Sequence, residues 1–497
     1  GRVRDLARFA AGGRHDEQLV VEAAAAVVAV LVVSRHQTVA VSANVFVNPP
    51  GLIDASNSPT VVRDPHRPDS LVVVRRVDRP RFSAGLDWSN DGGAHWNHTA
   101  LPLPAGDDRP YAPDAAFAPD GTLYVTYVNL EGAGNTPANL WVAKSTDDGA
   151  SLSAPVRATG RLAFQPRLAV GGTGAVYLTW MQASEVGLLK LGPGPHPVVL
   201  ARSTDGGQTF SAPSQVSDPG RPRVGAASPV VDRQGNVLVL YEDFKGDVRD
   251  FENLEGPPWD QPFALVLSRS TDGGRSFPAG TEVDAGLLAT HRFLVFLPEY
   301  PSLAVGTRGR LYVAWSDGRN GDEDVFLRRS DDDGRTWSGP IRVNNDRLHD
   351  GTDQSLPRVA VGDNGQVSLV FLDRRRDPTN VMSDAELATS SDGGRSYRNI
   401  RVSSASFGSG VGPVTGPPFP VDFGSRLGLV AGHGAVVAAW TDSRLGTAAT
   451  GRQDVVAATV RLPPPTRGLA RWPTALVLLA LGVASLAGWV LTAHEAT

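Results

Sequence analysis

The segment Ser330-Asp331-Asp332-Asp333-Gly334-Arg335-Thr336-Trp337 is one copy of an octet with the pattern Ser-x-Asp-x-Gly-x-x-aromatic. Four more copies occupy residues 89–96, 203–210, 270–277 and 390–397, and a sixth at residues 145–152 ends in leucine. The pattern is typical of a tight turn, because the Asp carboxylate accepts backbone N–H groups and Gly adopts a positive φ. We therefore interpret the aspartates at the third position as structural: Asp91, Asp147, Asp205, Asp272, Asp332 and Asp392.

Each octet belongs to a longer unit that we predict to contain four strands. Residues 166–170 and 176–180 show the first two strands, separated by a glycine turn, and the third strand leads into the octet. The octets begin 56 to 67 residues apart, a length that suits a four-stranded antiparallel sheet with its turns. Seven such units open near Pro59, Pro113, Pro166, Pro229, Pro301, Pro357 and Arg426.

The seventh unit is incomplete, because it stops after its third strand at residues 454–460 and has no octet. Residues 38–47 precede the first unit at the interval that elsewhere separates a fourth strand from the next opening. We therefore predict an all-β, seven-bladed β-propeller over residues 38–461, in which the N-terminal strand completes the last blade and removes an exposed sheet edge.

The composition agrees with a β protein and excludes several kinds of site. The 497 residues include 54 Gly and 38 Pro, which is typical of a chain with many turns. There are no cysteines, so disulfides, thiolate metal sites and thiol nucleophiles are absent. A net charge of -5 without a basic block argues against nucleic-acid binding.

Both ends of the chain have features of membrane segments. Residues 473–493 carry no charge and are long enough to cross a bilayer as a helix. Within residues 1–37, four arginines precede an apolar run at 23–33, which indicates an export signal or signal-anchor; residues 41–43 resemble a signal-peptidase site. A Pro/Arg linker (462–472) and a short tail (494–497) flank the C-terminal segment.

These segments predict a cell-membrane protein whose propeller lies outside the cytoplasm. The distribution of basic residues around the C-terminal segment predicts the opposite orientation, because basic residues tend to stay in the cytoplasm. Three arginines, Arg461, Arg467 and Arg471, precede that segment, and only His494 and Glu495 follow it. We give priority to the N-terminal segment, because the first segment usually sets the orientation.

The octets resemble the Asp boxes, or BNR repeats, of the sialidase superfamily, and the resemblance covers about residues 38 to 461. Sialidases are typically six-bladed, so the resemblance gives a six-bladed ring as the alternative fold. It implies a sialidase-like glycoside hydrolase acting on acidic glycans. The same superfamily includes non-catalytic propellers, so the alternative function is binding of a glycan, an envelope polymer or a protein partner.

Candidate site residues lie on the face that carries the long connections, because loops on a rigid scaffold are where sites are built. The residue after each unit opening should face the central axis, which gives a ring of Thr60, Asp114, Arg167, Ser228, Ser302, Arg358 and Arg426. The resemblance implies that Arg167, Arg358 and Arg426 hold a substrate carboxylate. It also implies Tyr300 as nucleophile, Glu242 as the group that activates it and Asp114 as acid/base.

Two alternatives remain open for the charged residues. The ring arginines can instead be neutralised by carboxylates of neighbouring blades, which is the commoner use of such residues. A repeated Asp-x-Arg element (317–319, 373–375 and 442–444) predicts a structural brace. Asp317, Asp322 and Asp324 with Asn320 give a weaker calcium hypothesis, and otherwise we expect no cofactor.

Overall fold

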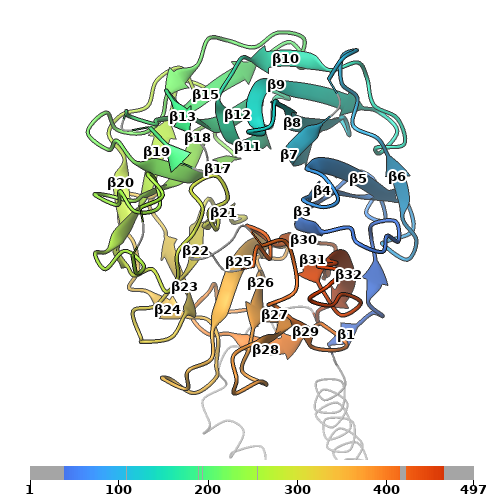
Figure 1. Cartoon of the computed structure of the whole chain (residues 1–497), viewed down its shortest axis with the longest axis vertical. Helices are drawn as coiled ribbons and strands as arrows, with labels where there is room; N and C mark the ends of the chain where they lie inside the picture. Colours follow the sequence, from blue (N-terminus) through green and yellow to red (C-terminus); the bar gives the residue numbers. More distant parts are fainter. Residues whose placement is uncertain are drawn as a thin grey trace, which may run out of the picture. The chain divides into compact units, whose positions relative to one another are not determined.

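Seven antiparallel sheets lie in a ring about a central axis (Figure 1). The computed structural model describes residues 39–463 except 108, 188–189, 193, 255 and 415–420, and Val41–Arg461 form one compact unit. The predicted membrane segments at both ends lie outside the described residues. Among the residues that the structure describes, no helix is long and apolar enough to cross a membrane.

The blades follow the chain order, and each runs from an innermost to an outermost strand. The first three blades are β3 (Ser56–Arg63), β4 (Leu71–Val77), β5 (Ser83–Ser89) and β6 (Asn97–Thr99); β7 (Pro110–Phe117), β8 (Leu123–Glu131), β9 (Thr136–Ser145) and β10 (Val156–Thr159); and β11 (Ala163–Val170), β12 (Val176–Gln182), β15 (Val198–Ser203) and β16 (Ser214–Gln215). A small hairpin, β13 (Val186–Gly187) and β14 (Lys190–Leu191), interrupts the third blade.

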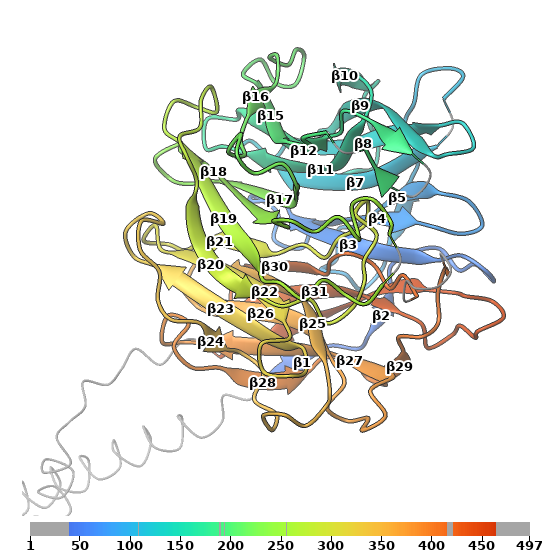
Figure 2. The same ribbon diagram turned by 60° about the vertical axis from the view of Figure 1, so that its left-hand side comes forward.

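The next three blades repeat this order, and Figure 2 shows their outer strands β20, β24 and β28 from the side. They are β17 (Val224–Val231), β18 (Val237–Asp243), β19 (Phe263–Ser270) and β20 (Thr281–Leu287); β21 (Ser302–Val305), β22 (Leu311–Asp317), β23 (Asp324–Ser330) and β24 (Ile341–Arg342); and β25 (Gln354–Val361), β26 (Val367–Asp373), β27 (Met382–Ser390) and β28 (Arg398–Arg401). A short strand, β29 (Phe407–Gly408), pairs with β27.

The seventh blade joins the two ends of the propeller, as the sequence predicts. It contains β30 (Gly428–Gly432), β31 (Ala435–Asp442) and β32 (Asp454–Arg461), and its outer position is filled by β1 (Ala40–Val41) and β2 (Val45–Phe46). The N–H of Val47 donates to the carbonyl of Val455 at 2.8 Å, which extends this pairing. The seven blades and the N-terminal closing strand are confirmed, and the six-bladed alternative is wrong.

The octets form the turns between the third and fourth strands of six blades. In the fifth blade, the Ser330 hydroxyl donates to Asp332 Oδ1 at 2.8 Å, and the same carboxylate oxygen accepts the Thr336 N–H at 2.9 Å. Gly334 adopts a φ of +85°. All six aspartates accept the hydroxyl of the octet serine and the N–H four residues on, so each one caps its turn.

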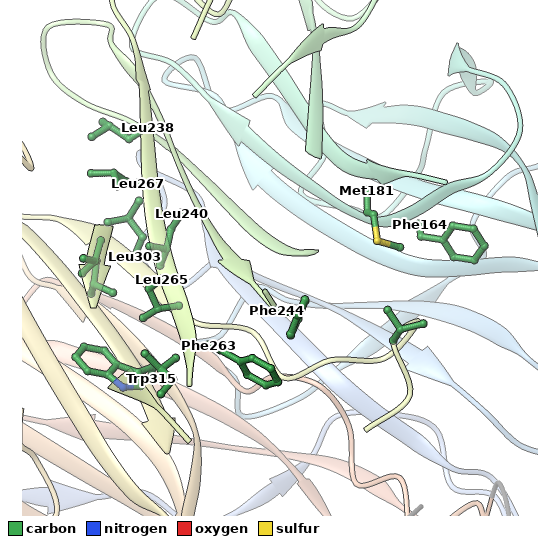
Figure 3. Packing of buried hydrophobic residues seen from close by; sticks show 14 of the residues in the cluster. Phe164, Met181, Leu238, Leu240, Phe244, Phe263, Leu265, Leu267, Leu303 and Trp315 are labelled. Atoms are coloured by element: carbon green, nitrogen blue, oxygen red, sulfur yellow. The ribbon is translucent and has the colours of Figure 1, made fainter. Parts of the chain in front are cut away.

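Apolar side chains between adjacent blades form the core, because each sheet buries both of its faces against its neighbours. Figure 3 shows Leu238, Leu240 and Leu265 of the fourth blade packing toward Leu303 and Trp315 of the fifth. The repeated Asp-x-Arg element is a brace at the end of the second strand: Arg319 Nη2, Arg375 Nη2 and Arg444 Nη2 lie 2.5–2.6 Å from the aspartate two residues earlier.

Candidate functional site

The larger connections gather on one face of the propeller. Glycine turns and octets occupy one face, so the connections between strands two and three, and between blades, occupy the other. On that second face a pocket of about 410 Å³ lies between the connections of the fourth to seventh blades. Its wall includes Glu299, Glu323, Asp353 and Arg374. The face that the sequence analysis predicts to be functional therefore carries a pocket.

A group of glutamates forms the chemically distinctive part of this pocket. Glu299 and Glu323 line both the large pocket and an adjoining cavity of about 70 Å³, and Glu242 lines the smaller cavity. The Ser316 hydroxyl donates to Glu299 Oε2 at 3.4 Å, and the Thr290 hydroxyl donates to Glu323 Oε2 at 3.4 Å. The fourth blade, the fifth blade and the connection between them thus each contribute a carboxyl group to one place.

The environment raises the pKa of all three glutamates. Burial raises the pKa of Glu242 to about 8, and the charge of Glu299 adds to this shift. Burial and the charge of Glu299 likewise raise the pKa of Glu323 to about 8. Burial also raises the pKa of Glu299, to about 7, although Ser316 and Arg374 favour its charged form. Glu299 therefore has the lowest pKa of the three, and its charge favours the protonated forms of Glu242 and Glu323.

Arginines of three blades meet at the axis, as the ring of inner-strand positions predicts. Arg167 Nη1 lies 3.1 Å from Asp114 Oδ1, and both side chains are buried. The Thr60 hydroxyl donates to Asp114 at 2.9 Å, and Arg426 Nε donates to Thr60 Oγ1 at 3.1 Å. Arg426 Nη2 also donates to the carbonyl of Pro113 at 2.6 Å. Asp114 is thus held as a structural counter-ion by its neighbours.

Tyr300 and Arg358 complete this arginine cluster. The guanidinium carbons of Arg167 and Arg426 lie 5.1 Å and 5.9 Å from the centre of the Tyr300 ring, and burial raises the pKa of Tyr300. Burial and the charge of Arg167 lower the pKa of Arg358 to about 10. Among the described residues, the Arg358 side chain has no ion pair and no hydrogen bond. The cluster therefore contains three guanidinium groups but only one carboxylate, that of Asp114.

The structure brings together most of the predicted site residues. Asp114, Arg167, Arg426 and Tyr300 are in contact, and Arg358 interacts with Arg167 and Asp114 through its charge. Glu242 does not join them: its carboxyl group lies by Glu299 in the smaller cavity, and no contact with Tyr300 occurs among the described residues.

Sequence reasoning missed Glu299 and Glu323. Glu299 immediately precedes Tyr300, and Glu323 lies within the acidic run that prompted the calcium hypothesis. In that run, Asp317 pairs with Arg319, and Asp324 pairs with Arg342. Across the described part of the chain, no group of three or more His, Asp or Glu side chains is arranged to hold a metal ion. The adjacency of Glu299 to Tyr300 was the available signal, and no repeat position marks Glu323.

Comparisons with known proteins find similarity at the level of structure. No protein-family model matches the chain, and no curated protein matches it. A protein of unknown function from Dyadobacter fermentans DSM 18053 is 13% identical, with a TM-score of 0.46 over 86% of this chain and 99% of that chain. Hadza microbial sialidase Hz136 is 14% identical, with a TM-score of 0.43 over 76% of this chain and 75% of that chain.

A third solved structure, a PL25 ulvan lyase bound to -[GlcA(1-4)Rha3S]-, is 12% identical, with a TM-score of 0.47 over 80% of this chain and 93% of that chain. These similarities concern the fold alone. The function of this chain therefore has to be argued from its own side chains.

Proposed function

We propose that the propeller is a glycoside hydrolase that acts on acidic glycans, with Glu299 and Glu323 as its pair of catalytic carboxyl groups. The observation that carries this proposal is that both glutamates line one pocket of about 410 Å³ on the face with the large connections. Two carboxyl groups with different protonation states on one pocket are what glycosidic bond cleavage requires.

The environment of each glutamate supports a separate role. Glu323, whose pKa is raised to about 8, is protonated at neutral pH and would donate its proton to the glycosidic oxygen as the bond to the leaving sugar breaks. Glu299 is more acidic than Glu323 and would be the carboxylate that attacks the anomeric carbon or removes a proton from the attacking water. In the first route, water that gives its proton to Glu323 would then displace Glu299 from the anomeric carbon. Both routes therefore consume one water, and a hydroxyl forms on each side of the cleaved bond.

The preference for an acidic substrate rests on the arginine cluster. Glu299 lines the pocket, and the next residue, Tyr300, contacts Arg167 of the cluster, so one segment of the chain connects the two groups. Arg358 forms no ion pair among the described residues, and the nearby charge of Asp114 is already paired with Arg167, so a carboxylate of the substrate would supply a further negative charge.

The finer, sialidase-type version of the proposal assigns Tyr300 as the nucleophile and Glu242 as its base. Two observations favour the pair of glutamates instead: burial raises the pKa of Tyr300, and Glu242 lies by Glu299. Substitution Tyr300→Phe separates the two versions, because it would abolish turnover only if the phenol oxygen attacks the sugar.

The second candidate function is a non-catalytic receptor for an acidic glycan, envelope polymer or protein. The guanidinium group of Arg358, which forms no ion pair among the described residues, favours it, since an anion can bind there without any chemistry at Glu299. In both versions we propose that the propeller is attached to the cell membrane and lies outside the cytoplasm. Protease treatment of intact cells should then release it, whereas complete protection would place the domain on the cytoplasmic side.

Hydrolysis of fluorogenic glycosides tests the two functions. We expect turnover of a sialoside or a glucuronide and little of a neutral galactoside, and a loss of at least about 100-fold in Glu299→Gln and Glu323→Gln. Glu131→Gln is the matched control, because its carboxylate is about half exposed on the surface. Binding of the free acidic sugar without turnover of any glycoside would support the receptor, and full activity in both variants would reject the assigned pair.

A further inference from the structure

A second pocket, of about 500 Å³, lies between the outer strands of the first and seventh blades, which are neighbours in the ring (Figure 1). Its volume falls within the range of about 300–1,000 Å³ that is usual for small-molecule sites. One wall comes from β2 and the two prolines that follow it, and the other comes from β5 and β6. Among the described residues, the two pockets have no lining residue in common. The second pocket therefore spans the junction where the ring closes.

Phe46 distinguishes this junction from the equivalent places in two other blades. In the outer strands of the fifth and sixth blades, Arg342 and Arg401 occupy the position of Phe46, since each lies opposite the residue two after an aspartate of the third strand. Arg342 pairs with that aspartate, Asp324, and Arg401 pairs with Asp384, both at 2.6 Å. Phe46 cannot form this ion pair, and it is 39% exposed at the pocket.

A different arginine forms the ion pair in the seventh blade. Arg452, in the connection from β31, donates from Nε to Asp454 Oδ2 at 2.8 Å. Asn48 Nδ2 donates to Asp454 Oδ1 at 3.0 Å. Because Asp454 already has these partners, the blade does not need an arginine at position 46. The aromatic side chain of Phe46 is therefore available to line the pocket.

The opposite wall adds a second aromatic ring and a further paired carboxylate. Trp96, the last residue of the first octet, is partly buried against the apolar cluster between the two blades. His98 Nδ1 lies 3.1 Å from Asp87 Oδ1, and Arg75 Nε donates to Asp87 Oδ2 at 2.7 Å. Both carboxylates that line the pocket, those of Asp87 and Asp454, thus have basic partners.

We propose that this pocket binds a neutral oligosaccharide. Phe46 and Trp96 suit the apolar faces of sugar rings, and Asn97, His98 and Arg452 supply hydrogen-bonding groups for sugar hydroxyls. A neutral ligand fits because the lining carboxylates are already paired. Hydroxyls fit better than peptide N–H groups, since a hydroxyl can accept from these side chains, whereas a peptide N–H needs an acceptor. The site is separate from the proposed hydrolysis and holds a glycan without cleaving it.

Calorimetric titration of the full chain with cellotetraose, chitotetraose and mannotetraose tests the proposal. Phe46→Arg places in the pocket the residue of the fifth and sixth blades and should weaken binding at least about 10-fold, because the apolar contact with the sugar is lost. Val41→Arg is the matched control, since Val41 is also exposed in the closing segment but does not line the pocket. His98→Ala, on the opposite wall, should also weaken binding and serves if Phe46→Arg is unstable.

The expected result is that at least one tetrasaccharide binds to the wild type and to Val41→Arg and loses affinity in the two pocket variants. The same sugar should raise the melting temperature of the wild type, because it contacts both blades at the closure. No binding of any of the three sugars, unchanged affinity in both pocket variants, or binding only of a neutral tyrosine-containing tetrapeptide would overturn the proposal. Glu299→Gln should bind the sugar as the wild type does; weaker binding would place the sugar in the glutamate pocket and also overturn it.

Discussion

Ser42 and Thr459, which are 417 positions apart in the chain, form two hydrogen bonds in the seventh blade, one from the Ser42 N–H to the Thr459 carbonyl and one from the Thr459 N–H to the Ser42 hydroxyl oxygen. Val47 and Val455 continue the same pairing. A closed ring has no free sheet edge between its first and last blades, so these contacts affect every blade and not just the terminus.

Deletion of residues 1–47 should therefore destabilise the whole propeller. Each lost hydrogen bond contributes about 0.5–1.5 kcal/mol, and the uncovered edge of β32 exposes further apolar surface. We expect a lower melting temperature in one cooperative transition by calorimetry. Deletion of residues 1–37, which leaves the strand in place, is the control; equal stability of the two truncated proteins would refute the closure argument.

Activity should depend on pH through the glutamate pair. With apparent pKa values of about 7 for Glu299 and about 8 for Glu323, hydrolysis should decline below pH 7 as Glu299 is protonated. It should also decline above pH 8 as Glu323 loses its proton. The measured quantity is kcat/KM from pH 5 to pH 10, because its pH dependence reports the ionisations of the free enzyme. A profile that stays flat between pH 6 and pH 9 is incompatible with these roles.

Stability should respond to pH through Glu242. Its pKa is raised by burial from 4.5 to about 8, so its contribution to stability is complete below pH 4.5 and is lost as the pH rises through 8. Glu242→Gln should melt at a higher temperature than the wild type at pH 8.5 and at the same temperature at pH 4.5. Glu131→Gln serves as the exposed control. An identical difference at both pH values would mean that Glu242 is not buried as an acid.

Arg358→Ala should weaken binding of a free acidic sugar, measured by calorimetry. The loss of a charge-assisted contact corresponds to about 1.5–3 kcal/mol, or roughly 10- to 100-fold in affinity. Arg335→Ala, in an octet on the opposite face, is the matched control. Because Arg358 lies near the like charge of Arg167, its removal should leave the melting temperature unchanged or raise it. A strongly destabilised Arg358→Ala protein would instead indicate a structural role.

Removal of the serine hydroxyl of an octet should lower the stability of the propeller and leave the rate of hydrolysis unchanged. The Ser330 hydroxyl accepts the buried N–H of Gly334 at 2.8 Å, so Ser330→Ala leaves that group unpaired at a cost of about 1–3 kcal/mol. Ser391→Ala, at an exposed octet position, should change stability by less than about 0.5 kcal/mol. Denaturant unfolding and the rate of hydrolysis are measured for both variants. Slower hydrolysis by Ser330→Ala at unchanged stability would contradict the purely structural role of the octet.

The architecture of this protein was determined by local features that the sequence displays. The turn chemistry of Asp332 and Gly334 depends on residues within one octet, and the repeat of the unit sets the number of blades. The inner-strand position of Arg167 was predictable for the same reason, since equivalent positions of successive blades face one axis. Arg426 lies two residues before β30, whose register gives Gly428 as the equivalent position.

Only the tertiary structure decided which groups form the glutamate pocket. Glu242 lies in β18, but Glu299 and Glu323 come from connections that follow no repeat, so the meeting of the three depends on how those connections fold. The connection between the fourth and fifth blades places Glu299 beside Glu242, while the Tyr300 ring lies against Arg167. The raised pKa values arise from burial and from the proximity of like charges, and both are properties of the assembled blades rather than of any segment.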